Sequence, residues 1–118
     1  MFFPEGQIRV YLYGQPADMR CSFDGLQALT RHAMGQDPLN GSLYVFVNRR
    51  GAQVRVLYFD RSGFAMWQKR LEVDKFPWPK KHTELVVQLT PEQFSWLLDG
   101  YDVWKIKPFS ELYFEKVS

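Results

Sequence analysis

The sequence contains one cysteine, Cys21, and two histidines among its 118 residues. A single cysteine cannot form a disulfide within the chain, so we expect the protein in a reducing compartment, the cytoplasm. No cysteine or histidine lies at the spacing of a zinc site, and the glycines are isolated rather than grouped into a phosphate-binding loop. The residues therefore give no reason to expect a metal or a cofactor.

Long apolar runs are also absent. The longest uninterrupted one, Leu43 to Val47, is far shorter than the roughly 20 residues that a membrane-spanning helix needs. The N-terminal residues lack the charged and apolar segments of a secretory signal. The apolar fraction is nevertheless 46%, which is enough for a core, so we expect residues 1–118 to form a single domain.

Alternating residues in the middle of the chain predict a β-meander. The expected strands are Leu43 to Val47, Ala52 to Asp60 and Phe64 to Leu71. The second of these alternates with a period of two, which is typical of a pleated strand with two different faces. Asn48 to Gly51 and Arg61 to Gly63 have the composition of tight turns, and connections this short join antiparallel neighbours.

Further strands and a first helix are expected around this meander. The strands are residues 8–13 and 84–89, and residues 111–115 are a candidate for a last one. Ser22 is the expected N-cap of the first helix, which Gly35 would end. The expected buried stripe of this helix is Phe23, Leu26, Leu29, Ala33 and Met34.

The clearest local signal is the start of a second helix. Thr90 as N-cap, Pro91 at the first helical position and Gln93 at the third form a capping box. The expected apolar face of this helix consists of Phe94, Leu97 and Leu98. Together the elements predict an α+β domain with an antiparallel β-meander sheet of about four to six strands and two short helices.

The charge is small overall but unevenly distributed. The formal net charge is +2, whereas residues 49–82 contain nine basic and three acidic side chains. A negatively charged partner that approaches one side of the molecule would suit this distribution. The alternative is that turns and solvent-facing strand positions simply require charged side chains, without any partner.

Basic residues interleaved with aromatic ones are the main lead to function. The candidate phosphate contacts are Arg49, Arg50, Arg61, Lys69, Arg70, Lys75, Lys80 and Lys81, with Arg20 beside them. Trp78, which lies between two prolines, is the candidate exposed aromatic, either for nucleic-acid contact or as an anchor for a protein partner. For Trp67 we expect a place in the core.

Candidate catalytic residues are few. Asp18, Asp24 and Asp60 could hold a metal ion for phosphodiester cleavage, but each also has an ordinary explanation as a loop, helix or turn residue. Cys21 lies near a helix N-terminus, which can lower the pKa of a thiol, yet no histidine lies close to it in sequence. We therefore expect that the protein is not an enzyme.

Four ordered blocks of residues carry a resemblance to a known family. They are Ala17 to Arg20 with Phe23 to Leu26; Asp37 to Gly51; Val56 to Glu72; and Phe76 to Pro79 with Leu89 to Gly100. The chain resembles the small accessory protein, of the TnpB type, that is encoded beside the transposase in the insertion sequence sixty-six family of bacterial transposable elements. The resemblance covers residues 8–104, and the tail 105–118 lies outside it.

Two positions depart from the family pattern. Cys21 stands where relatives commonly carry lysine after the Asp-Met-Arg motif, and Leu57 to Asp60 stands in place of a Leu-Trp-Trp-Asp segment. The resemblance implies a protein that is needed for efficient transposition without being the cutting enzyme. It also implies the transposase of the same element as a partner. DNA at the ends of the element is the partner in the first hypothesis below.

Three hypotheses of function follow. The first is a non-catalytic accessory factor of transposition that binds DNA through the basic turns of the meander, with Arg49 and Arg50 as the first phosphate contacts. The second is a module that docks on the transposase without touching DNA, anchored by Phe76, Trp78 and the face around Trp104. The third is a small metal-dependent nuclease. The oligomeric state is left open.

Overall fold

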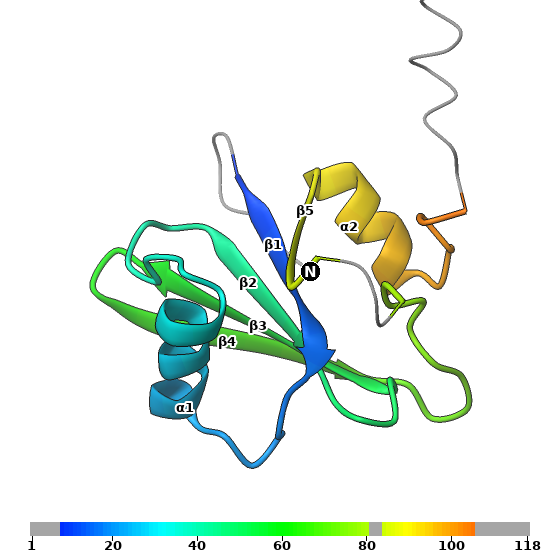
Figure 1. Ribbon diagram of the computed structural model, residues 1–118, viewed down its shortest axis with the longest axis horizontal. Helices are drawn as coiled ribbons and strands as arrows, with labels where there is room; N and C mark the ends of the chain where they lie inside the picture. The colour runs from blue at the N-terminus through cyan, green and yellow to red at the C-terminus, as the bar shows by residue number, and fades with distance from the viewer. Residues whose placement is uncertain (1–7, 81–83, 106–118) are drawn as a thin grey trace, which may run out of the picture.

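The computed structural model describes residues 8–80 and 84–105. In chain order the elements are β1 (Val10–Pro16), α1 (Phe23–Ala28) followed by a π-helical turn (Leu29–Ala33), β2 (Leu43–Val47), β3 (Gln53–Asp60), β4 (Gly63–Arg70), β5 (Val86–Leu89) and α2 (Pro91–Leu98). The strands lie side by side in one twisted sheet, and α1 and α2 lie on different sides of it (Figure 1). The candidate strand at residues 111–115 lies outside the described residues.

The five strands form one mixed sheet in the order β4-β3-β2-β1-β5. Strands β2, β3 and β4 are antiparallel neighbours joined by short turns, so the predicted meander exists as one part of the sheet. Strand β1 is antiparallel to β5 but parallel to β2. The expectation of a purely antiparallel meander sheet is therefore wrong, whereas the α+β class and the number of strands are confirmed.

The parallel pair follows from the connection between its two strands. The chain from β1 to β2 passes through α1, and a helical crossover can return the chain to the end of the sheet at which β1 began. A tight turn cannot do this, since it reverses the chain direction. The alternation of apolar and polar residues in β1 predicts a strand, but it does not indicate which strands will pair with β1.

Side chains alternate between the two faces of the sheet, and one helix covers each face. Val45 and Val56 are cross-strand partners in β2 and β3, and both pack in a cluster with Phe94 of α2. Tyr44 and Leu57, the adjacent pair, point the other way and pack in the cluster that contains α1. The core therefore has two parts, one between the sheet and each helix.

The first helix is buried in part along the predicted line, with Leu26 and Met34 buried as expected and Leu29 partly buried against the same cluster. Leu26, Thr30 and Met34 are buried, whereas Phe23 is 43% exposed, so its predicted burial is wrong. The second half of the helix widens into a π turn, in which the Met34 N–H donates to the Leu29 carbonyl at 3.0 Å. The wider turn aligns residues four apart. The buried Thr30 hydroxyl is satisfied because it donates to the Leu26 carbonyl at 2.8 Å.

The second helix begins as predicted. The Gln93 N–H donates to Thr90 Oγ1 at 3.1 Å, and the Thr90 N–H donates to the Gln93 side-chain oxygen at 3.0 Å. This capping box is thereby confirmed, and so is the burial of Phe94, Leu97 and Leu98. These three side chains attach α2 to the sheet, so the helix depends on tertiary packing as well as on its cap.

Candidate nucleic-acid interface

The turn between β2 and β3 holds two adjacent arginines, Arg49 and Arg50, in a fixed backbone frame. Asn48 builds that frame, since its Oδ1 accepts from two backbone N–H groups just after the turn, at 3.0 and 3.1 Å. Gly51 closes the turn with an N–H bonded to the Asn48 carbonyl at 3.0 Å and with a φ of 77°, in the left-handed region. Both arginines are exposed, and neither side chain is paired with any described residue.

A second segment, the loop that follows β1, is fixed to the sheet near this turn. The Ala17 N–H donates to the Val47 carbonyl at 2.8 Å, which ties the start of the loop to the end of β2. Arg55 on β3 holds the other end: its Nη1 donates to the Cys21 carbonyl at 2.8 Å, and its Nε donates to Gln68 Oε1 at 3.1 Å. Because both ends of the loop are anchored, the residues between them have a defined position.

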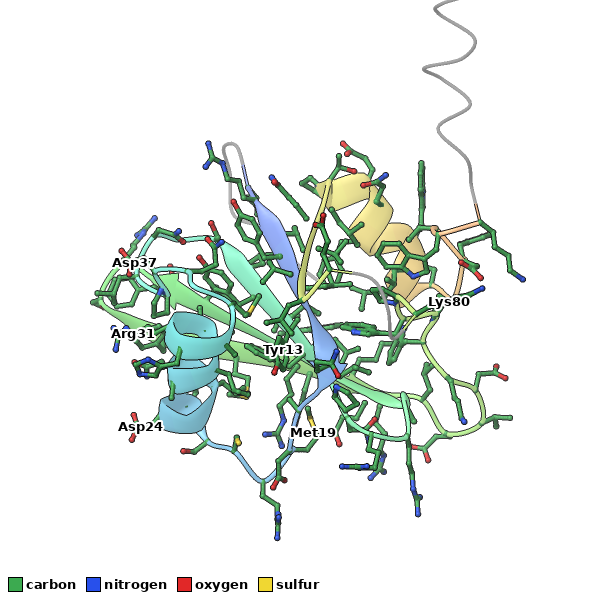
Figure 2. All side chains as sticks on the ribbon, viewed as in Figure 1. Tyr13, Met19, Asp24, Arg31, Asp37 and Lys80 are labelled. Carbon is green, nitrogen blue, oxygen red and sulfur yellow. The ribbon has the colours of Figure 1, made fainter. Side chains whose placement is uncertain are left out.

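The turn and the loop line one shallow groove of about 410 Å³. Its lining residues are Pro16, Ala17, Asp18, Met19, Arg20, Asn48, Arg49 and Arg50. Figure 2 shows Met19 in this region, with nitrogen-bearing side chains around it. The structure therefore brings Arg20 to Arg49 and Arg50, although these residues come from segments far apart in the sequence. We call this site the arginine groove.

Asp18 and Arg20 form an exposed ion pair at the rim of the arginine groove. Arg20 Nη2 lies 2.7 Å from Asp18 Oδ2, the Arg20 Nε lies 3.1 Å from both carboxylate oxygens, and the Arg20 N–H donates to Oδ1 at 2.9 Å. These hydrogen bonds from Arg20 lower the pKa of Asp18 to about 2, so the carboxylate is ionised at physiological pH. The pair fixes the direction of the Arg20 guanidinium but cancels part of its charge.

A second groove, of about 700 Å³, continues from Arg50 along the same end of the sheet. Its charged lining residues are Arg50, Arg70, Glu72, Asp74 and Lys75. Arg70 is the cross-strand partner of Gln53, which places it at the end of β3 that adjoins the turn. Its Nη2 lies 3.3 Å from Glu72 Oε1 in an exposed ion pair. The basic surface thus extends beyond the arginine groove, with acidic residues interspersed.

The sequence matches a known protein family over most of its length. A family model described as IS66 Orf2 like protein matches residues 8–108. The chain belongs to this family. The resemblance found in the sequence is thereby confirmed, and membership associates this IS66 Orf2-like protein with the transposition of an insertion sequence.

Two curated relatives of this IS66 Orf2-like protein come from Sinorhizobium fredii (strain NBRC 101917 / NGR234). Uncharacterized protein y4hO is 35% identical over 103 residues, which cover 86% of this chain and 88% of the relative. Uncharacterized protein y4jC is 35% identical over 107 residues, which cover 91% of both chains. No solved structure matches the chain significantly.

The IS66 Orf2-like protein does not bring every predicted phosphate contact to the arginine groove. Arg61 lies in the turn between β3 and β4, and the eight residues of β3 span roughly 23 Å at 3.3 Å per residue. Lys69 Nζ donates to the Leu98 carbonyl at 3.1 Å, at the C-terminal end of α2. Figure 2 places Lys80 on the α2 side of the molecule, and Lys81 lies outside the described residues.

The aromatic residues predicted as partner anchors are turned inward. Phe76 is only 3% exposed and packs in the cluster that contains α2, so its side chain does not present a surface to a partner. The Trp78 indole N–H donates to the Tyr13 carbonyl at 3.0 Å, and the Trp104 indole N–H donates to the Pro77 carbonyl. Both tryptophans are half-buried. The proline-rich segment has neither helix nor strand, and its hydrogen bonds hold it along the body of the protein.

The three carboxylates considered for metal-dependent cleavage are not assembled into one site. Asp18 lines the arginine groove, Asp60 ends β3 at the opposite end of the strand, and Asp24 lies in the first turn of α1. Within residues 8–80 and 84–105, no three His, Cys, Asp or Glu side chains lie close enough together to hold a metal ion. In the same ranges, no helix is long and apolar enough to cross a membrane.

Two residues that position the groove were not recognised in the sequence. Asn48 counted only as part of a turn, although an asparagine that opens a turn commonly accepts hydrogen bonds from the backbone beyond it. This signal was available. The sequence shows Arg55 only as one of the basic residues. Its hydrogen bond to the Cys21 carbonyl spans 34 positions, so no local pattern indicates it.

Proposed function

We propose that this IS66 Orf2-like protein is a non-catalytic accessory factor of transposition that binds DNA through the arginine groove. The observation that carries the proposal is the pair Arg49 and Arg50, exposed in a turn that Asn48 fixes and without a described partner. Guanidinium groups match phosphate oxygens in geometry and charge. Because the turn is already ordered, little backbone conformational entropy is lost when a phosphate binds.

The chemistry of the groove favours the DNA backbone over the bases. Contacts from arginine to phosphate give affinity and position but do not read sequence. The lining includes Met19 but no aromatic side chain on which a base could stack. We therefore expect the protein to bind duplex DNA, including the ends of the element, with little preference for sequence.

Fluorescence anisotropy of a labelled duplex tests this function. The duplex carries the terminal repeat of the element, the salt concentration is varied, and a scrambled duplex serves as competitor. Three arginines and the ionised Asp18 carboxylate leave two net positive charges in the groove, so log K should fall with log salt concentration with a slope of about −1.8, since each neutralised phosphate contributes about 0.9. Absence of binding, or binding that does not change with salt, would refute the proposal.

Asp18→Asn is expected to tighten binding to duplex DNA by up to about eightfold at 0.1 M salt, the effect of one additional net positive charge. The carboxylate has a pKa of about 2, so it stays charged at assay pH and repels phosphate from the groove. Asp24→Asn, the same change on α1, serves as the control and should leave binding unchanged. An equal gain in both variants would point to net charge rather than to the groove.

Variants of Asn48 separate the shape of the turn from its charge. Asn48→Ala removes the acceptor of two hydrogen bonds, so we expect a loss of about 1–3 kcal/mol in the free energy of unfolding and weaker DNA binding. Asn48→Asp keeps the acceptor oxygens and should keep the stability, but its negative charge should weaken DNA binding. Urea unfolding and anisotropy measure the two effects. Unchanged DNA binding in Asn48→Asp would contradict the role of the turn.

A further inference from the structure

The two most exposed aromatic side chains among the described residues lie at the end of α2. Tyr101 is 62% exposed and Trp96 is 47% exposed. A Schellman motif holds them at the same end of the helix: the Tyr101 N–H donates to the Trp96 carbonyl at 3.0 Å, and the Gly100 N–H donates to the Leu97 carbonyl at 3.0 Å. Gly100 adopts the φ of 97° that such a helix end needs.

Packing on the other side of α2 fixes this aromatic pair in place. Phe94, Leu97 and Leu98 are buried against the sheet, which leaves Trp96 on the outward face of the helix. Figure 1 shows α2 away from α1, at the far side of the sheet. Exposed tryptophan and tyrosine on a rigid element are typical of residues that dominate protein–protein binding energy.

Carboxylates surround the aromatic pair. Residues 90–104 contain three acidic side chains and no lysine, arginine or histidine. Glu92 lies one helical turn before Trp96 and Asp99 lies three residues after it, so both neighbour the tryptophan on the helix surface, and both are exposed. The third, Asp102, accepts hydrogen bonds from the backbone of its own turn.

Among the described residues, lysines adjoin this surface beside Asp102, where Lys105 Nζ lies 3.9 Å from Asp102 Oδ2, and on the side of the sheet. There Asp99 lines a groove of about 450 Å³ with Lys69 and Lys75. Lys69 Nζ donates to the Leu98 carbonyl, so its positive charge is held at the C-terminal end of α2. The acidic character is therefore strongest around Glu92, on the side away from the sheet.

We propose that Trp96 and Tyr101, with Glu92 and Asp99, form a docking surface for a basic segment of a protein partner. The segment would carry arginine or lysine beside an apolar residue, because a guanidinium stacks on an indole face and pairs with a carboxylate. Phosphate groups are repelled by the same carboxylates, so this surface does not bind DNA. Its elements differ from those of the arginine groove, and the inference stands whether or not that groove binds DNA.

The probes are the purified transposase of the same element and overlapping 20-residue labelled peptides that cover it, with binding measured by fluorescence anisotropy. Peptides rich in arginine or lysine should bind the wild type. Trp96→Ala/Tyr101→Ala should weaken that binding at least tenfold, and Glu92→Lys should also weaken it. Phe23→Ala, a change at an exposed aromatic of α1, is the control and should have no effect. Circular dichroism should show all variants folded, since these side chains are exposed.

Several results would overturn the proposal. These are no binding of the transposase or of any peptide, binding by the Trp96 and Tyr101 variant as strong as that of the wild type, and a preference for acidic peptides. Self-association of the wild type that the same variant abolishes would identify a second copy as the occupant instead. Arg49→Ala/Arg50→Ala should leave peptide binding unchanged, so the failure of either proposal is visible separately.

Discussion

Replacing Arg49 and Arg50 together with alanine is expected to weaken binding to duplex DNA about 60-fold at 0.1 M salt. Both side chains line the arginine groove. Neither is bonded to a described residue, so the substitution breaks no described interaction within the protein. Each lost phosphate contact removes about 0.9 from the slope of log K against log salt. Two contacts therefore account for about 1.8 log units of affinity at 0.1 M salt and for the same reduction in slope.

A control with the same change in net charge decides whether position matters. Arg31→Ala/Arg61→Ala removes two exposed arginines. Arg31 lies in the π-helical turn that follows α1, as Figure 2 shows, and Arg61 lies in the turn at the far end of β3. This variant should keep most of the affinity and the full salt slope. Equal weakening in both double variants would show that the overall charge of the protein, not the arginine groove, governs binding.

Most of the secondary structure could be predicted because its causes are local. Alternation of side chains defined the strands of the meander, and Thr90 with Gln93 defined the start of α2. The parallel pairing of β1 with β2 could not be predicted in this way, since it depends on where the crossover returns the chain. The burial of Thr30 was missed for a related reason, because the π turn changes the spacing of residues on the helix surface.

The arginine groove was predictable only in part. Arg49 and Arg50 are adjacent in an obvious turn, whereas their closeness to Arg20 depends on anchors such as the bond between Arg55 and the Cys21 carbonyl. The exposure of Trp96 on α2, in contrast, could be predicted from the local sequence. Its exposure follows from helix phase, since a helix that buries Phe94, Leu97 and Leu98 must turn Trp96 outward. The two prolines around Trp78 suggested display, but that side chain is half-buried and its indole N–H donates to the Tyr13 carbonyl.

Phe94→Ala is expected to lower the free energy of unfolding by about 3–5 kcal/mol, the range for removing a fully buried phenylalanine. Its ring is 0% exposed and packs with the valines of β2 and β3, so the truncation leaves a cavity between α2 and the sheet. Urea unfolding followed by circular dichroism measures the loss. Because α2 carries Trp96, the same variant should also weaken binding of basic peptides.

Phe23→Ala is the matched control, because it is the same substitution at a helical position that periodicity also predicted to be buried. The Phe23 side chain is 43% exposed, so little apolar surface returns to water and the expected loss is about 1 kcal/mol or less. A difference of several kcal/mol between the two variants would support the two-part core in which Phe23 is not buried. Equal losses would mean that Phe23 is packed in solution, and the predicted burial of this residue would then be right.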